Sequence, residues 1–346
     1  MKATASVPLP TFLRTLVLPA VTVVFLLALQ SPVRGAAAAL PADPAGMVAS
    51  LPTASPHWVW VNDFVFPHMT DGQARLIDGD SGRFLGMLST GYGFARIVLA
   101  REGNVIFSPE TYFSRGTRGT RTDVVSLYDA THLSAIGEIE TAGCALDFPT
   151  GPRSFFSICA DGTLLDVRLD DSGHATTRER TARVFDALHD PATEKGVRVG
   201  NTWYFVSYSG VLYPIQITDK GLTLGTRWSL INPADQAEKW RPGGLQQLAV
   251  HAGLNRLYSI MHRGGPETHK DPGKEVWVYD LAKRARIQRI AMKNDSGSIQ
   301  VTHDAKPLLF SIFIESTSLD IYDATSGDWL RSVENAGTTP TIMVVP

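Results

Sequence analysis

A pattern of two strands joined by a tight turn recurs along most of this sequence. In each copy a run of β-forming residues ends at an aspartate or an equivalent residue, a turn with glycine or another polar residue follows, and a second strand leaves. The copies lie at residues 74–87, 123–139, 162–169, 210–217, 275–290 and 319–330. Their spacings of roughly 40 to 65 residues are typical of propeller blades built from four short strands. We therefore predict an all-β chain folded as a β-propeller, with six countable blades.

Two further hairpins support this interpretation and one alternative stays open. Residues 201–208 and 256–261 carry the dense β-branched and aromatic content of buried strands. Helical periodicity is nowhere sustained over a comparable length. Because the repeat is loose and Pro-rich loops could hide a boundary, a β-sandwich or a pair of β domains is the alternative.

The N-terminus has the features of a secretory signal. Lys2 and Arg14 precede a charge-free run at 16–29, which a small-residue stretch at 35–39 follows. An uncleaved membrane anchor is the rival interpretation, but a span needs about 20 apolar residues and Pro19 interrupts this shorter run. The domain boundaries expected are therefore a signal peptide at 1–39, a flexible Ala- and Pro-rich arm at 40–56 and a single propeller at 57–346, exported to the periplasm and free of the membrane after cleavage.

Two cysteines, Cys144 and Cys159, both lie in the part predicted to be exported. In an oxidising compartment they predict a disulfide that closes a loop of about 15 residues, and two free buried thiols are the alternative. Two cysteines are too few for a zinc ribbon or an iron-sulfur site.

The search for catalytic motifs is mostly negative. Hydrolase elbows, nucleotide-binding loops and metalloprotease or EF-hand signatures do not occur. His262 and His269 lie close in sequence, but a metal would need a third ligand and only Glu267 is near, so no metal site is expected. A net charge of -2 and a pI of about 6.5 do not indicate nucleic-acid binding. The aspartates that recur at the blade turns predict turn chemistry rather than acid-base catalysis; they are Asp78, Asp129, Asp280 and Asp323.

Several motifs spread over nearly all of the mature chain resemble those of one family. The basic, glycine-rich segment 112–129 and the segment Trp240-Arg-Pro-Gly-Gly-Leu-Gln-Gln247 are the most distinctive. The others are residues 77–83, Gly86-Met87, the cysteine pair around 147–150, His269-Lys270 before 276–278, and 306–309 with 322–327 and 330–333. Together they resemble the large (heavy) subunit of the tryptophan tryptophylquinone-dependent amine dehydrogenases, the methylamine and aromatic amine dehydrogenase family.

This resemblance implies a periplasmic enzyme that oxidises primary amines to aldehydes and ammonia. In the family the large subunit is a seven-bladed propeller without cofactor or catalytic residues of its own. It holds a cysteine-rich small subunit that bears the tryptophan tryptophylquinone, in an assembly of two large and two small subunits. A blue copper protein of the amicyanin or azurin kind accepts the electrons. The seven tryptophans of this chain are then expected to serve blade packing.

The family also contributes an aromatic side chain to the substrate channel from the loop after the first Gly-Met strand. Here Tyr92 is the first candidate and Phe94 the second, with a steric role at the channel mouth. An ordinary loop aromatic packed on the blade is the alternative. The residues expected to contact the partner subunit are Arg115, Arg118, Arg121, Trp240 and Arg241. For the three loop arginines, a structural turn that ion-pairs with the partner is expected, and an anion-binding loop is the alternative.

One departure from the family is large. Only Thr141-Ala-Gly143 separates Glu140 from Cys144, where the family has about one more blade. The chain is therefore either a true six-bladed variant or one that has lost a blade, and a smaller ring has a narrower channel.

Two other functions remain alternatives. One is a non-enzymatic periplasmic propeller that binds a protein or glycan. The other is a propeller hydrolase of the lactonase kind, which needs a central calcium held by Glu, Asn and Asp. Asparagines are present at 62, 104, 201 and 294, but no spacing singles them out. Within the family, the loop at 261–270 favours aromatic amines, whereas residues 330–333 resemble the methylamine form.

Overall fold

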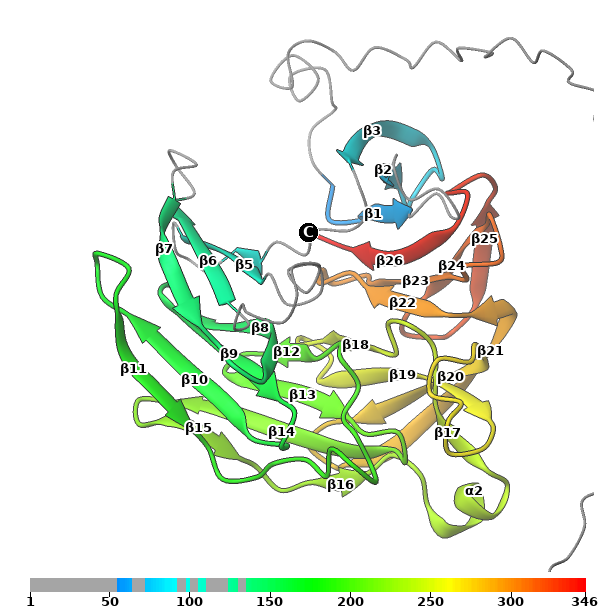
Figure 1. Ribbon diagram of the computed structural model, residues 1–346. Helices are drawn as coiled ribbons and strands as arrows, with labels where there is room; N and C mark the ends of the chain where they lie inside the picture. The colour runs from blue at the N-terminus through cyan, green and yellow to red at the C-terminus, as the bar shows by residue number, and fades with distance from the viewer. Residues whose placement is uncertain (1–54, 64–71, 92–97, 100–104, 110–123, 130–134) are drawn as a thin grey trace, which may run out of the picture. The chain divides into compact units, whose positions relative to one another are not determined.

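The computed structural model describes residues 55–63, 72–91, 98–99, 105–109, 124–129 and 135–346, all within the compact unit 45–346. In these residues antiparallel strands form six sheets of four or five strands. One short helix, α2 (Pro233–Ala237), precedes the fifth sheet and begins with an Asn232 capping box (Figure 1). The prediction of an all-β propeller is confirmed. The seventh blade of the family pattern is not seen among the described residues.

The first three sheets follow the chain from its N-terminal side. Sheet 1 consists of β26 (Pro340–Val344), β1 (Trp58–Asp63), β2 (Gly72–Asp78) and β3 (Phe84–Gly91). Sheet 2 consists of β4 (Val98–Leu99), β5 (Val105–Pro109), β6 (Val124–Asp129) and β7 (Ala135–Glu140). Sheet 3 consists of β8 (Cys144–Gly151), β9 (Ser154–Cys159), β10 (Leu164–Leu169) and β11 (Ala175–Arg180).

Of the other three sheets, two contain a fifth strand. Sheet 4 consists of β12 (Val197–Val199), β13 (Thr202–Val206), β14 (Val211–Thr218) and β15 (Gly221–Leu224), with β16 (Trp228–Ser229) also paired to β14. Sheet 5 consists of β17 (Trp240–Pro242) and β18 (Leu248–His251), both paired to β19 (Arg256–Arg263), then β20 (Gly273–Asp280) and β21 (Ala285–Ser296). Sheet 6 consists of β22 (Ser298–Val301), β23 (Leu308–Ile312), β24 (Leu319–Asp323) and β25 (Trp329–Val333).

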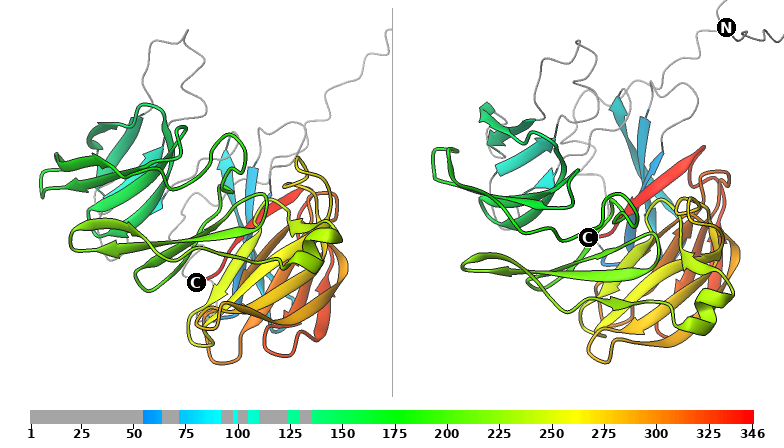
Figure 2. Two further views of the ribbon diagram at one scale, coloured as in Figure 1. Left: turned by 90° about the horizontal axis from the view of Figure 1, so that it is seen from below. Right: turned by 60° about the horizontal axis from the view of Figure 1, so that its bottom comes forward.

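The two ends of the described chain meet in sheet 1. The C-terminal strand β26 pairs antiparallel with β1, with Val61 opposite Met343, and Figure 2 shows this pairing from two further directions. The buried carboxylate of Asp63 accepts hydrogen bonds from the backbone N–H and the hydroxyl of Thr339, at 2.8 and 3.0 Å. The first strands of neighbouring sheets contact each other, as β12 with β18, β18 with β22, and β22 with β26 do.

Hydrophobic clusters join sheets 2 to 6 in order and sheet 6 to sheet 1. Five clusters of buried side chains lie between sheets 2 and 3, 3 and 4, 4 and 5, 5 and 6, and 6 and 1. The cluster between sheets 3 and 4 is aromatic: the Phe148 and Phe205 rings meet edge to face at 4.8 Å. Since a single sheet of this size cannot bury its own faces, packing of sheet on sheet supplies most of the stability.

Three of the four predicted turn aspartates, Asp78, Asp280 and Asp323, act as the sequence predicts, and the side chain of Asp129 lies outside the described part of the chain. Oδ1 of Asp280 accepts hydrogen bonds from the backbone of Ala282 and Lys283, both at 2.9 Å. Asp78 and Asp323 cap the corresponding turns of sheets 1 and 6, and Asp170 does so in sheet 3. Each of these aspartates ends, or directly follows, the third strand of its sheet, where a side-chain acceptor satisfies the backbone of a tight turn.

The junction between sheets 2 and 3 is short and closely packed. β7 ends at Glu140 and β8 begins at Cys144, with the Cys144 N–H bonded to Thr141 O at 2.7 Å. Cys144 and Cys159 face each other in β8 and β9 and form the predicted disulfide. Both sulfurs belong to the hydrophobic cluster that joins the two sheets. Residues 141–143 therefore carry the chain directly from one packed sheet to the next.

Candidate functional site

The first strands of the sheets all begin on one side of the propeller. We call this side the leading face. In sheet 5, Trp240 at the start of β17 lies opposite Arg263 at the end of β19, and β20 begins beside them at Gly273. Because neighbouring strands are antiparallel, connections from the second to the third strand share this face with connections from one sheet to the next. In the described residues it includes the connections 181–196, 207–210 and 264–272.

Several residues predicted from the sequence lie outside the described residues. These are Tyr92, Phe94, Arg115, Arg118 and Arg121. The strands on either side of them are described: β3 ends at Gly91, β5 ends at Pro109 and β6 begins at Val124, each at the leading face of its sheet. Their predicted roles in the channel and at the partner interface remain predictions.

Trp240 is held by its own sheet. Its side chain belongs to a buried cluster and the residue is 8% exposed. The ring centroid lies 5.0 Å from that of Trp277, and the guanidinium carbons of Arg263 and Arg289 lie 4.9 Å from it. The indole N–H donates to the Glu238 carboxylate at 3.1 Å. These ring and cation-π contacts leave only a small part of Trp240 accessible to a partner, and its interface role remains a prediction.

The glycine pair after Pro242 makes room for close contacts. A methyl group in place of the Gly243 hydrogen would lie 2.4 Å from both Cδ2 of His262 and the carbonyl oxygen of Asp271. Gly244 has φ of +96°, and a side chain there would meet Gly297 O at 2.4 Å. Glycine is therefore required at both positions, and the first strand of sheet 5 is interrupted between β17 and β18.

The two glutamines that follow are the residues that sequence reasoning missed. Gln246 forms a parallel bridge with Ser298 of sheet 6 and also reaches Met343 of β26. Gln247, 3% exposed, donates from Nε2 to the carbonyl oxygens of Gly244 and His269. The signal that could have found them is the Pro-Gly-Gly interruption within a β-rich run, since an interrupted strand leaves its neighbours' backbone groups to be satisfied by side chains.

Tyr208 and His269 form a stacked pair across two neighbouring sheets. Their ring centroids are 3.7 Å apart and their planes differ by 10°. Burial and the positive charge of Lys270 lower the pKa of His269, while burial and the charges of Glu194 and Glu267 raise the pKa of Tyr208. Both rings are therefore neutral near pH 7, and the pair presents an uncharged aromatic surface.

Four buried side-chain atoms around this stack have no hydrogen-bond partner among the described residues. They are Arg241 Nε, Gln247 Oε1, His262 Nε2 and His269 Nδ1. Burial also lowers the pKa of His262, so this imidazole is neutral as well. Unsatisfied buried polar atoms are uncommon in folded proteins and call for a specific explanation. Their concentration makes this part of the leading face the candidate functional site, and it contains Arg241, one of the predicted interface residues.

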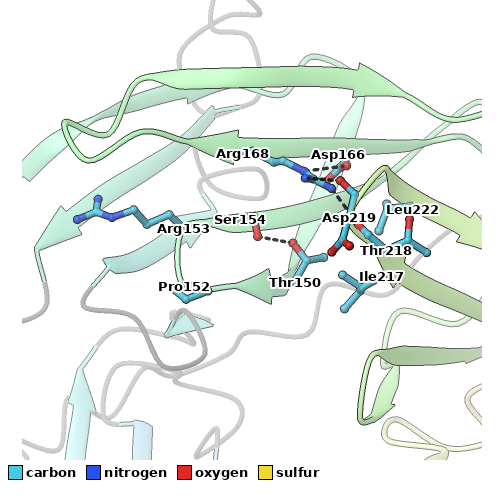
Figure 3. A pocket seen from close by; sticks show the side chains of 10 residues that line it. All are labelled: Thr150, Pro152, Arg153, Ser154, Asp166, Arg168, Ile217, Thr218, Asp219 and Leu222. Carbon is cyan, nitrogen blue, oxygen red and sulfur yellow. Dashed lines mark hydrogen bonds and ion pairs between the residues drawn. The ribbon is translucent and has the colours of Figure 1, made fainter.

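A shallow hollow of about 370 Å³ lies between sheets 3 and 4, near the end of the sheets opposite the leading face. Figure 3 shows Arg168 turned toward Asp166 and Asp219, and Arg153 extended away from them. Arg168 donates to the carbonyl oxygens of Thr218 and Asp219, both at 3.2 Å, and burial raises the pKa of Asp166. Because Arg168 is engaged with Asp166 and with the backbone, and none of the predicted residues lines the hollow, we assign this hollow no role.

Two kinds of feature are absent from the described residues, a cluster of metal-ligating side chains and a membrane-spanning helix. No group of three or more His, Cys, Asp or Glu side chains in them is arranged to hold a metal ion. Within the same residues, no helix has the length and apolar character needed to cross a membrane. In the described part of the leading face, Tyr208 and His269 form a neutral stacked pair, and aromatic side chains are enriched at protein interfaces.

Comparison with known sequences gives one family. The sequence profile described as methylamine dehydrogenase heavy chain (MADH) matches residues 56–146 and 139–345. The two matched segments meet at the short junction between sheets 2 and 3, where the sequence suggests that a blade is missing.

Individual heavy chains are similar over most of their length. The methylamine dehydrogenase heavy chain of Methylophilus methylotrophus is 26% identical over 86% of this chain and 85% of its own length. That of Paracoccus versutus is 28% identical over 78% of this chain and 75% of its own.

Solved structures align more loosely. Dihydro-heme d1 dehydrogenase NirN in complex with DHE aligns with a TM-score of 0.47 at 14% identity, covering 82% of this chain and 56% of that one. Sqt1 of Saccharomyces cerevisiae aligns with a TM-score of 0.47 at 11% identity, covering 79% of this chain and 70% of that one. Similarity at this level carries no argument about function.

Proposed function

Because the chain belongs to the methylamine dehydrogenase heavy chain family, we propose that it is the large subunit of a periplasmic quinoprotein amine dehydrogenase. The enzyme oxidises a primary amine by two electrons, and water supplies the oxygen of the aldehyde as ammonia leaves. The tryptophan tryptophylquinone on the cysteine-rich small subunit takes up the electrons, and a blue copper protein of the amicyanin or azurin kind accepts them. Two large and two small subunits form the enzyme.

The observation that carries this proposal is the family match along nearly the whole propeller, from residue 56 to 345. The printed name of the relatives, heavy chain, implies a light partner. The tryptophans of this chain support a scaffolding role: Trp240 and Trp277 each donate their indole N–H to a glutamate and pack against arginines in sheet 5. The work assigned to this chain is to hold the small subunit and shape the access of substrate.

The substrate channel is assigned to the connection after β3. Tyr92, or failing that Phe94, would limit the size and shape of the amine at the channel mouth. The partner interface is assigned to Arg115, Arg118, Arg121, Trp240 and Arg241. The position of the flanking strand ends and of Trp240 at the leading face supports placing all of these roles on one side of the propeller.

The chain is proposed to act as a six-bladed variant of the seven-bladed family. The close packing of sheet 2 on sheet 3, with the disulfide inside their shared cluster, supports a stable junction without the further blade. Export is assigned to the signal peptide at 1–39, with the arm at 40–56 leading into the propeller.

The test is to co-produce the tagged chain with the small subunit of the same organism in the periplasm and record a visible spectrum of the purified material. We expect the small subunit to co-purify, with a quinone absorbance that bleaches when methylamine or phenylethylamine is added; the amine that bleaches it faster identifies the substrate class. A colourless chain that is recovered alone would contradict the enzyme and favour the non-enzymatic binding propeller.

Substrate selection is tested on the same complex. Tyr92→Ala is expected to raise kcat/KM for phenylethylamine relative to methylamine by about tenfold, because a removed ring widens the channel. Tyr92→Phe, which keeps the ring, is the control and should leave the ratio unchanged. An unchanged ratio in the alanine variant moves the role to Phe94.

A further inference from the structure

One leucine on the leading face is almost fully exposed. Leu188 has 85% of its surface accessible and lies at the tip of the tight loop 186–190, in the connection between sheets 3 and 4. Single exposed leucines are ordinary on protein surfaces. The setting of this one is unusual because the loop that carries it is fixed by many hydrogen bonds.

The loop is closed by Asp186. Its Oδ1 accepts the backbone N–H of Leu188 at 3.3 Å and that of His189 at 3.1 Å. Its carbonyl oxygen accepts the backbone N–H of Asp190 at 3.0 Å. The backbone on both sides of Leu188 is therefore held by the same residue, and the leucine side chain projects from a defined turn.

Asp190 then fastens the loop to the neighbouring sheet. Its carboxylate accepts the hydroxyls of Ser207 and Ser209, at 2.7 and 2.6 Å, and the backbone N–H of Ser209 at 2.7 Å. Between these serines, the Tyr208 N–H donates to Pro191 O at 3.0 Å. Tyr208 is the residue that stacks on His269. Four hydrogen bonds therefore join the loop that carries Leu188 to the segment that contains Tyr208 in the candidate site.

An apolar side chain on a rigid loop loses little conformational entropy when a partner covers it, so it contributes most of its burial to affinity. The neutral, stacked Tyr208 and His269 rings connect sheet 4 to sheet 5 on this face. The connection after β3 and the connection between β5 and β6 leave from the same face, and they contain the residues assigned to the channel and the interface. A partner that binds beside these strand ends would cover the leading face.

We propose that Leu188 is an anchor residue for the cofactor-bearing small subunit, inserted into an apolar pocket of that subunit beside the stacked pair Tyr208 and His269. This inference rests on the proposed function, because it takes the small subunit as the partner. It assigns to the interface a loop that none of the family motifs in the sequence includes.

The experiment compares Leu188→Asp with Leu224→Asp. Leu224 is 40% exposed and lies on β15, the outer strand of sheet 4, so it offers the same substitution away from the leading face. Each variant chain, with its unfolding temperature checked against the unaltered chain, is titrated with the purified quinone-bearing small subunit of the same organism. We expect Leu188→Asp to raise Kd about tenfold or more, and Leu224→Asp to leave it within about twofold.

The outcomes separate the two proposals. If the unaltered chain binds the small subunit and Leu188→Asp binds it equally well, the anchor is wrong while the proposed function stands. The anchor is also overturned if both variants lose affinity alike. If the unaltered chain does not bind the small subunit at all, the proposed function is overturned and the anchor with it.

Discussion

The side-chain amide of Gln246 pairs with both backbone groups of Met343. Its Nε2 donates to the Met343 carbonyl oxygen and its Oε1 accepts the Met343 N–H, both at 3.0 Å and across 97 positions in the sequence. β26 is the first strand of sheet 1, so one of its edges has no neighbouring strand. Gln246 satisfies that edge as a strand would, and it connects sheet 5 to the strand that joins the two ends of the described chain.

We expect Gln246→Ala to lower the free energy of unfolding by about 1 to 3 kcal/mol. The substitution removes the hydrogen-bond partner of the N–H and the C=O of Met343, which is fully buried. Urea unfolding at equilibrium measures this. Gln236→Ala, at an exposed position of α2, is the control and should change stability by less than about 0.5 kcal/mol. Equal stability of the two variants would show that the Gln246 side chain does not stabilise the edge of β26.

Replacing Gly243 tests the close contact with His262. We expect Gly243→Ala to destabilise the chain by about 1 to 3 kcal/mol, since the new methyl group would overlap the His262 ring and the Asp271 carbonyl. Gly265→Ala lies in the neighbouring loop, where a methyl group meets nothing within 4 Å. The unfolding temperatures of the two variants, measured side by side, test this prediction. The prediction fails if Gly243→Ala unfolds at the same temperature as Gly265→Ala.

The disulfide between Cys144 and Cys159 is expected to stabilise the folded chain. We expect reduction, or the double change Cys144→Ala and Cys159→Ala, to cost about 3 kcal/mol for a loop of this length, with a separation of 15 residues. Unfolding with and without dithiothreitol measures the effect. The double variant is its own control, because its stability must not respond to the reductant. A loss near zero in the double variant would contradict the prediction.

His57 lies between two carboxylates from different sheets. Its Nδ1 is 2.6 Å from Asp80 in sheet 1, and its Nε2 is 3.0 Å from Asp304 in the turn between β22 and β23. Burial lowers the pKa of His57, but the hydrogen bonds and charges of Asp80 and Asp304 raise it more, so it ends above 6.5. Burial raises the pKa of Asp304, but hydrogen bonds from Thr302, Lys306 and His57 outweigh this and set it at about 2.

The pKa shifts of His57 and Asp304 make the stability of the folded chain depend on pH. The contribution of His57 is fully present below pH 6.5 and is lost as the pH rises through its higher folded pKa. The contribution of Asp304 is present above 3.8 and is lost as the pH falls toward about 2. Between these limits the ion pairs should stabilise the contact of sheet 1 with sheet 6 most strongly.

We expect the unaltered chain to lose more free energy of unfolding between about pH 5 and about pH 8.5 than His57→Gln does, because the variant has no imidazolium to lose. Urea titrations at the two pH values measure the difference. His174→Gln, whose imidazole is 82% exposed, is the control and should follow the unaltered chain. Identical pH dependence in all three proteins would contradict the role of His57.

Much of the fold could be predicted from local patterns. The strands around Asp78, Asp280 and Asp323 are marked by β-forming residues and by turn aspartates that act on their own neighbours, so their chemistry is visible within a few residues. The pairing of Cys144 with Cys159 is similarly local, because only one partner is available. The sequence alone therefore determined the class of fold, the hairpins, the disulfide and, through its motifs, the family.

The tertiary structure decided what depends on distant segments meeting. No local pattern links Gln246 to Met343, Tyr208 to His269 or Asp190 to the serines of the next sheet, because each pair joins elements that come together only when the sheets pack side by side. Packing also decided that the tryptophan of the motif at 240–247 is buried and that Gln246 connects three sheets. Exposure and burial depend on the complete set of neighbours, and for that reason Leu188 drew no notice in the sequence while the fold placed it on the leading face.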